Sequence, residues 1–341
     1  MAKPIVSFKD VDIVFGDKPE TALPLIDQGK SREDIQTATG QTLGVAGASF
    51  DIEEGEVIVL MGLSGSGKST LLRAVNGLNP VIRGAVEVRD GEALVNPATC
   101  SEEELRHLRR KRIAMVFQQF ALLPWRTVSE NVGFGLELAG ISQKERRGRV
   151  AEQLKLVGLD GWGEKYVHEL SGGMQQRVGL ARAFATDAPI LLMDEPFSAL
   201  DPLIRDRLQD ELLDLQKTLN RTIIFVSHDL DEAAKIGSRI AIMEGGRVIQ
   251  LGTPQQIVRK PATPYVADFV GHMNPLNVLR AKDIMADLND TVPADAPTCA
   301  PGTPLRQVIR MKQESGRSIV VADGSTPVGL ITEAELLGCL V

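Results

Sequence analysis

Apolar and polar residues largely alternate from residue 5 to residue 15, which predicts a strand with one buried face. The unbroken apolar run at residues 57–61 is typical of a parallel strand that is buried on both faces. Strands that alternate with helices predict an α/β fold. Similar patterns predict further strands at residues 45–52, 190–193, 222–226 and 240–243. Helices are predicted between them at residues 69–76, 203–219 and 230–236.

The middle of the chain has a different pattern. Residues 101–166 are charged and mostly helical, with a break at Pro124, so we expect an inserted helical subdomain at about residues 101–180. Residues 16–41 form a polar stretch with a short helical pattern near residues 22–28.

The end of the sequence predicts a separate small unit. We expect one domain at residues 1–275, a linker at 276–281 and an α+β module at 282–341. The module begins with a Pro/Thr-rich segment and a helix, and its strands are expected at residues 318–322 and 328–331.

The formal net charge of −7 argues against a protein that binds nucleic acid, since such proteins are usually basic. Cys100, Cys299 and Cys339 are scattered and match neither a disulfide framework nor a zinc site, which favours a reducing compartment. Residues 1–17 lack the pattern of a signal peptide, and no apolar run reaches the roughly 20 residues that span a bilayer. If the protein serves transport, we therefore expect the pore in another chain.

A phosphate-binding pattern, G-x-x-x-x-G-K-[ST], follows the run at residues 57–61 and precedes a predicted helix. Its glycines let the backbone N–H groups curl around phosphate oxygens. Lys68 would reach the β- and γ-phosphates, and the Ser69 hydroxyl would ligate Mg²⁺. A loop that merely turns the chain is the weaker interpretation. The candidate ATP-binding residues here are Gly62, Ser64, Gly65, Ser66, Gly67, Lys68, Ser69 and Thr70.

A second glycine-containing helix start lies at residues 170–177, Leu-Ser-Gly-Gly-Met-Gln-Gln-Arg. On its own, Ser-Gly-Gly is often a plain helix cap. One chain rarely needs two anion sites for one triphosphate, whereas two chains packed head to tail would each close over the nucleotide of the other. The residues expected to bind ATP in the partner are Ser171, Gly172, Gly173 and Gln175.

Acidic residues end the strand at 190–193, at the edge where α/β sheets place ligands. Asp194 would hold Mg²⁺, and Glu195 would act as general base on the attacking water. His228, after another strand, would hold the water in line, and Gln118 would sense Mg²⁺ and the water. Phe15, at the end of the first strand, would stack on adenine.

Together and in this order, these motifs resemble those of the nucleotide-binding subunits of ABC transporters over residues 1–275. The resemblance implies a P-loop ABC ATPase core with an inserted helical subdomain, which binds ATP and Mg²⁺ and works as a homodimer. Met174 departs from the usual Leu-Ser-Gly-Gly-Gln signature, although the residues that would touch phosphate are intact. The resemblance adds a dimer-contacting D-loop at Ser198, Ala199, Leu200 and Asp201.

The insert at residues 16–41 and the segment 272–279 are similar to those of the glycine betaine, choline and proline importers. Residues 122–128 also occur in similar form among taurine, sulfonate and nitrate importers, which leaves that alternative open. A soluble ABC ATPase with no transport role is the alternative from another class. Residues 282–341 resemble a single CBS module of the kind found in the betaine-type ATPases, with a generic β-hairpin and helix as the alternative.

The resemblance also implies the partners. We expect integral-membrane permease subunits, a periplasmic or lipid-anchored solute-binding protein, and no nucleic acid. The chain would then lie peripherally at the cytoplasmic face of the (inner) cell membrane. Leu122, Leu123 and Trp125 are apolar and adjoin a proline break, so we expect them to receive the permease.

Overall fold

The computed structural model describes residues 4–271, 273–288 and 295–338. The described chain forms two compact units. The first comprises residues 1–228 and 241–249, and the second comprises residues 229–240 and 250–341. His272 and parts of the expected C-terminal module, residues 289–294 and 339–341, lie outside the described residues.

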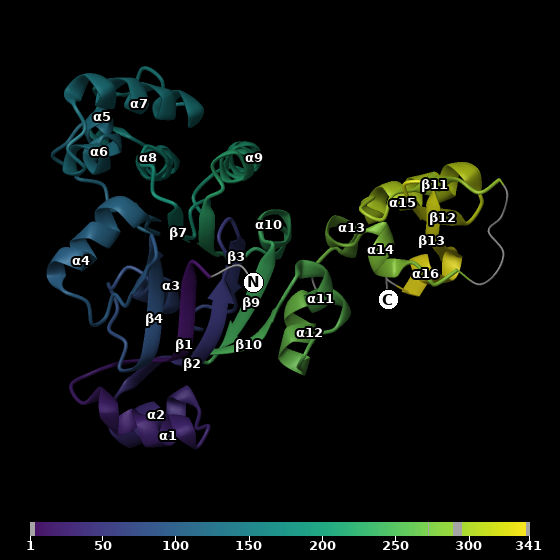
Figure 1. Ribbon diagram of the computed structural model, residues 1–341, viewed down its shortest axis with the longest axis horizontal. Coiled ribbons are helices and arrows are strands. Elements are labelled where there is room, and N and C mark those ends of the chain that lie inside the picture. The colour runs from purple at the N-terminus through teal and green to yellow at the C-terminus, as the bar shows by residue number, and fades with distance from the viewer. Residues whose placement is uncertain (1–3, 272, 289–294, 339–341) are drawn as a thin grey trace. The chain divides into compact units, whose positions relative to one another are not determined.

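A six-stranded sheet forms the core of the first unit, in the order β10-β9-β3-β8-β7-β6 (Figure 1). β3, β8, β7 and β6 run parallel to one another. β3, β7 and β8 are buried at every residue, because apolar runs can be covered on both faces of a sheet. The strands are β3 (Val57–Met61), β6 (Ile113–Val116), β7 (Ile190–Asp194), β8 (Thr222–Val226), β9 (Arg239–Glu244) and β10 (Arg247–Gly252).

An antiparallel four-stranded sheet, in the order β2-β1-β4-β5, forms a second layer of this unit. β1 pairs antiparallel with both β2 and β4, so the alternating residues of the first strand lie in the centre of the sheet. These strands are β1 (Val6–Phe15), β2 (Thr42–Ile52), β4 (Arg83–Asp90) and β5 (Ala93–Val95).

The polar stretch between β1 and β2 folds into a helical insert with η1 (Pro19–Ala22), α1 (Leu23–Asp27) and α2 (Arg32–Thr39). α1 lies where a helix was predicted, but α2 was not predicted. Its reciprocal cap between Ser31 and Asp34 starts the helix. Ile35, its one fully buried residue, packs in a cluster with Ile26 and Leu43. Because α2 buries a single residue, its sequence shows no repeating apolar positions from which a helix could be predicted.

Helices cover the sheets and build a subdomain around α5–α8 (Figure 1). A mostly helical subdomain was expected at about residues 101–180, and the structure adds a strand there, because β6 pairs in parallel with β7. This part of the unit contains α3 (Lys68–Ala74), α4 (Glu102–His107), η2 (Leu108–Arg112), α5 (Val128–Val132), α6 (Phe134–Leu138), α7 (Gln143–Leu156), η3 (Val167–Glu169), α8 (Gly172–Phe184) and α9 (Pro202–Leu219).

The second unit holds a three-stranded sheet, β11-β12-β13, in which β12 pairs antiparallel with β13. Leu305, Val308 and Ile319 are completely buried in its core. The expected linker, 276–281, overlaps α13 and the start of α14. The elements are α10 (Leu230–Ile236), α11 (Pro254–Arg259), α12 (Pro264–Val270), α13 (Pro275–Val278), α14 (Ala281–Ile284), β11 (Thr298–Cys299), α15 (Leu305–Ser315), β12 (Ile319–Asp323), β13 (Thr326–Ile331) and α16 (Glu333–Gly338).

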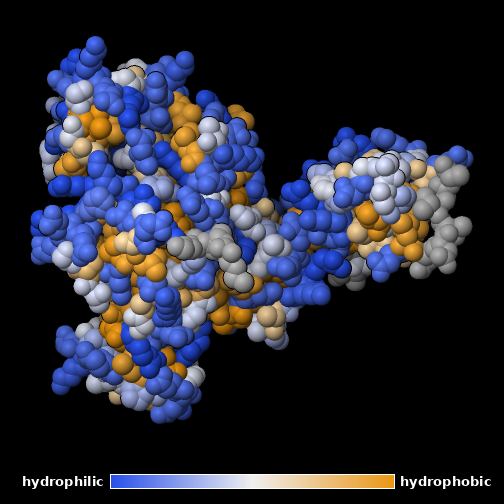
Figure 2. Space-filling view, in the orientation of Figure 1, coloured by the Kyte–Doolittle hydropathy of each residue, from blue (hydrophilic) through white to orange (hydrophobic). Residues whose placement is uncertain are grey.

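Polar side chains dominate the surface, with an apolar patch over α5 and α6 (Figure 2). Within the described ranges, no helix has both the length and the apolar character needed to cross a bilayer.

Candidate functional site

The candidate residues meet because parallel strands end at one edge of a sheet. β3 leads into the glycine-rich loop at residues 62–67, and β7 ends at Asp194 beside Glu195. Gln118 follows β6, and His228 follows β8. Neighbouring parallel strands therefore bring together four segments that are far apart in the sequence.

The glycine-rich loop needs glycine at its bends. Gly62, Gly65 and Gly67 have φ angles of +142°, +80° and +100°, a region that other residues rarely adopt. A Cβ atom on Gly62 would lie 2.1 Å from the Met243 carbonyl oxygen, and one on Gly67 would lie 2.4 Å from the Gly44 carbonyl oxygen. The tight curl thus depends on both backbone conformation and close packing.

The interior of the loop holds a cation and an unpaired hydroxyl. Lys68 Nζ donates to the carbonyl oxygens of Gly62 and Leu63, both at 2.9 Å. Burial lowers the pKa of Lys68, although the negative charges of Glu195 and Asp194 oppose that effect. Ser66 Oγ is buried and has no hydrogen-bond partner among the described residues. An anion with several acceptor oxygens fits this loop, because it would satisfy both groups.

A hydroxyl and a carboxylate form a candidate Mg²⁺ site beside the loop. Ser69 Oγ donates to Asp194 Oδ1 at 2.6 Å, and Asp194 is completely buried. Mg²⁺ in nucleotide sites is usually held by one or two carboxylates together with the phosphates, so this donor set fits it. Arg73 Nη2 pairs with the other oxygen of Asp194 at 2.8 Å. Arg73 was not among the residues predicted from the sequence, although it lies one helical turn after Ser69.

Two candidate residues converge on one carboxylate oxygen of a third, Glu195. Gln118 Nε2 lies 3.2 Å from Glu195 Oε2, and His228 Nδ1 lies 3.6 Å from the same oxygen. Glu195 has a φ angle of +49°, which is strained for a residue with a side chain. Its carboxylate can polarise a water molecule, while Gln118 and His228 limit where that water can lie.

Phe15 lies beside the same loop and remains partly open. A Cβ atom on Gly44 would lie 2.9 Å from both Phe15 Cε2 and Thr70 Cγ2, so the ring and the start of α3 both lie against Gly44. The side chain is 37% exposed, which leaves ring surface on which a flat base can stack.

The second glycine motif is exposed and stands apart from the first loop. Ser171 caps α8 by accepting from the Met174 N–H at 3.4 Å, and open space surrounds the Cα of Gly172. Gln175 turns inward and donates to the carbonyls of Val167 and Leu170. Among the described residues, no hydrogen bond joins positions 171–175 to positions 62–70.

The expected D-loop follows Glu195 and contacts it. Ser198 Oγ donates to the Glu195 carbonyl oxygen at 3.1 Å, and the Asp201 side chain caps α9. Ser198 and Ala199 are exposed, as a contact with a partner requires. Leu200 is only 6% exposed, so its side chain packs within its own chain.

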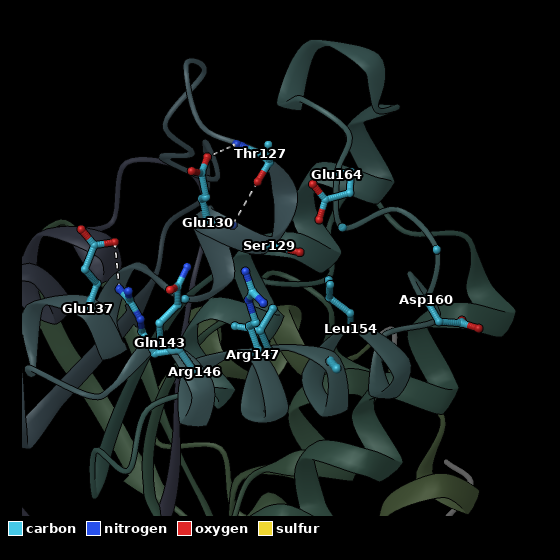
Figure 3. A pocket seen from close by; sticks show the side chains of 15 residues that line it. Thr127, Ser129, Glu130, Glu137, Gln143, Arg146, Arg147, Leu154, Asp160 and Glu164 are labelled. Atoms are coloured by element: carbon cyan, nitrogen blue, oxygen red, sulfur yellow. Dashed lines mark hydrogen bonds and ion pairs between the residues drawn. The ribbon is translucent and has the colours of Figure 1, made fainter.

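A cavity of about 560 Å³ lies on the helical subdomain, between α5–α7 and the turn at residues 160–164 (Figure 3). Glu137 pairs with Arg146 at one end of it. Trp125, two residues before the cavity-lining Thr127, is 71% exposed, whereas Leu122 and Leu123 are half-buried. Of the expected apolar patch, Trp125 is therefore the most accessible member.

The comparisons with known proteins agree with this geometry. The sequence model of a family described as "ABC transporter" matches residues 45–198. The glycine betaine/proline betaine transport system ATP-binding protein ProV of Escherichia coli is 49% identical over 96% of this chain and 80% of its own length. The trimethylamine N-oxide transport system ATP-binding protein TmoW of Ruegeria pomeroyi is 42% identical over 100% of this chain and 98% of its own.

A solved structure of an ATP-binding cassette is similar to this chain in fold and in sequence. The ATP-binding cassette MJ0796, in a dimeric post-hydrolysis state with ADP and Pi, is 31% identical and superposes with a TM-score of 0.63. The match covers 73% of this chain and 98% of that one.

Proposed function

This chain belongs to the ATP-binding subunits of ABC transporters, and from that premise we propose that it hydrolyses ATP to drive uptake of a quaternary amine or a closely related osmolyte. The observation that carries the proposal is the convergence of Gln118 and His228 on Glu195, beside the Ser69–Asp194 pair.

Each residue of the site has a distinct task in this proposal. Lys68 and the N–H groups of its loop bind the phosphates of ATP. Ser69 and Asp194 would hold Mg²⁺, with Gln118 near it, and the bound ion would neutralise phosphate charge. Glu195 accepts the proton of the attacking water as general base, and His228 holds that water in line with the γ-phosphate.

Two copies of the chain complete the site. The signature residues, Ser171, Gly172 and Gly173, present a helix start that is free to meet an anion. Because they make no hydrogen bond to the phosphate loop of their own chain, we infer that they bind ATP held by a partner subunit. The relative with a solved structure is itself a dimer.

Transport needs a permease, which would contact the helical subdomain. Trp125 and the cavity in Figure 3 supply an exposed aromatic ring and a hollow lined by charged residues, including Arg147 and Glu164. A helix end of the permease fits such a hollow. We also propose a peripheral position on the cytoplasmic face of the membrane and a separate solute-binding protein, because relatives such as ProV are named as ATP-binding proteins of transport systems.

The solute is inferred from the relatives. ProV is named for glycine betaine and proline betaine, and TmoW for trimethylamine N-oxide. All three solutes carry a methylated cationic nitrogen and an anionic oxygen. We propose that residues 282–341 act as a CBS-like regulatory module, supported by the β12–β13 hairpin and the amphipathic α15.

The test uses the complex with its own permease and binding protein in proteoliposomes. Wild-type complex should take up glycine betaine when ATP is inside. The Glu195→Gln variant should bind ATP normally but turn over about 10²–10⁴-fold more slowly, because removing a general base costs that much. Near-normal turnover would contradict the role of Glu195. Uptake of taurine or nitrate in place of the methylated solutes would contradict the solute class.

A further inference from the structure

The backbone around the general base is strained in three places, and one helix contacts all of them. Glu195, Phe120 and Ala121 have φ angles of +49°, +60° and +46°. Only Asp10 and Asn220 join them as non-glycine residues with positive φ in the described chain. Such conformations persist only where surrounding contacts hold them.

Gln176 holds the first strained site. Its side chain is 1% exposed and lies in the second turn of α8, the helix that begins at the signature motif. Its Nε2 donates to the Glu195 carbonyl oxygen at 3.2 Å. The same oxygen also accepts from the Ser198 hydroxyl. Its Oε1 accepts from the Ala199 N–H at 3.0 Å. The amide thus bridges the two ends of the turn that follows the general base.

Arg182 holds the second site from the same helix. Its guanidinium donates to the carbonyl oxygens of Ala121 at 2.7 Å and Phe120 at 2.9 Å. Burial lowers the pKa of Arg182, and no carboxylate in the described part of the chain offsets that effect. A half-buried cation without an acidic partner is costly, so its contacts with these two carbonyls are the reason it is tolerated.

The hydrogen bonds of Gln176 and those of Arg182, here called the two clamps, lie on the two sides of the contact between Gln118 and Glu195. The segment held by Arg182 follows Gln118, and the turn held by Gln176 contains Glu195. Gln118 and Glu195 meet at 3.2 Å. Between the clamps, Gly179 faces the Phe120 carbonyl oxygen, since a Cβ atom there would lie 3.8 Å from it. All three α8 residues lie on one face of the helix, three positions apart.

We propose that Gln176 and Arg182 are positioning residues that tie the signature helix to the catalytic glutamate of its own chain. The inference rests on the proposed shared-site dimer. When the start of α8 engages the partner's ATP, any shift of this helix moves both clamps and changes the position of Glu195. Occupancy of one site is thereby communicated to the general base of the other.

The first test separates chemistry from binding. In Gln176→Met, which keeps the side-chain volume, kcat should fall about 10- to 100-fold while the Kd for ATP stays within about twofold, because small misplacement of a catalytic group has effects of that size. The Hill coefficient for ATP should also fall toward one. Gln216→Met is the control, because it removes a comparable amide contact at the Gly55 carbonyl oxygen. Unchanged kcat in a folded Gln176→Met protein overturns the inference.

The second test uses mixed dimers to locate the defect. A dimer of one Gln176→Met subunit and one Glu195→Gln subunit should hydrolyse ATP slowly. The only intact general base in it belongs to the Gln176→Met subunit, where it is misplaced. A subunit carrying both substitutions, paired with wild type, should leave the wild-type site near its normal rate. If instead the first dimer were fast and the second slow, the defect would lie in the binding of the partner's ATP by residues 171–173. That result would refute the inference. If wild-type protein formed no ATP-dependent dimer, the proposed function itself would fail instead.

The third test asks whether Arg182 works by holding strained backbone. Arg182→Lys should lower kcat, and Arg177→Met, which removes contacts from the same helix to the Val157 and Gly158 carbonyls, should not. Adding Ala121→Gly to Arg182→Lys should restore several-fold of the lost rate, because glycine adopts positive φ without strain. No recovery, with the double variant folded, would show that strain at Ala121 is not what Arg182 holds.

Discussion

Replacing Arg73 by methionine would remove the only cation that pairs with Asp194 in the described chain. Asp194 is completely buried, and its two oxygens contact Arg73 at 2.8 Å and Ser69 at 2.6 Å. Breaking a buried pair by removing one partner typically costs 3–5 kcal/mol, because the remaining charge is left uncompensated. The Arg73 side chain is 38% exposed, so water can partly replace it. We therefore expect a loss of about 2–3 kcal/mol in the free energy of unfolding.

A double-mutant cycle tests this reasoning by urea unfolding without nucleotide. Asp194→Asn removes the buried charge, so Arg73→Met in that background should cost about 0.5 kcal/mol or less. The difference between the two costs measures the ion pair, with Arg73→Lys as the variant that keeps the charge. MgATP should stabilise Arg73→Met more than wild type, since Mg²⁺ supplies the missing positive charge. An equal cost of Arg73→Met in both backgrounds would refute the reasoning.

Three further predictions concern binding, coupling and regulation. Lys68→Ala should abolish ATP affinity, whereas Ser171→Arg should bind ATP as a monomer but fail to form the closed dimer; lost affinity in the Ser171→Arg monomer would contradict the shared site. Trp125→Ala should keep ATPase activity and the melting temperature but uncouple ATPase from uptake, while a loss of folded protein would indicate core packing. Truncation after Leu279 should leave ATPase and uptake running but remove their response to ionic strength or an added nucleotide in proteoliposomes; identical response curves would mean that the tail serves stability alone.

Local sequence was sufficient for the elements on which the site is built. The apolar runs of β3, β7 and β8 identify buried strands, because a strand covered on both faces shows no polar positions. The glycines of the phosphate loop identify a backbone that only glycine adopts without strain. Asp194, Glu195 and His228 could be proposed because they lie at the ends of such strands, and Gln118 because it comes shortly after the short apolar run at residues 113–116.

Other features carried too weak a local signal. α2 contributes a single fully buried residue, Ile35, and so shows no helical period. β6 lies within a charged, helix-rich region, and its four residues become a strand only through pairing with β7. A four-residue apolar run between helical segments can belong to either a strand or a helix, so its periodicity does not decide between them.

The sequence by itself determined the local backbone of the candidate nucleotide site, because the motifs are contiguous and each dictates its own conformation. The tertiary structure alone decided the contacts between them. Arg73 pairs with Asp194, and Gln176 and Arg182 reach carbonyls of segments that are remote in sequence. An arginine or glutamine on a helix looks the same whether it faces solvent or a neighbouring loop. Only packing of the strands and helices around one core selects its partner, because the contact depends on distance in space and not along the chain.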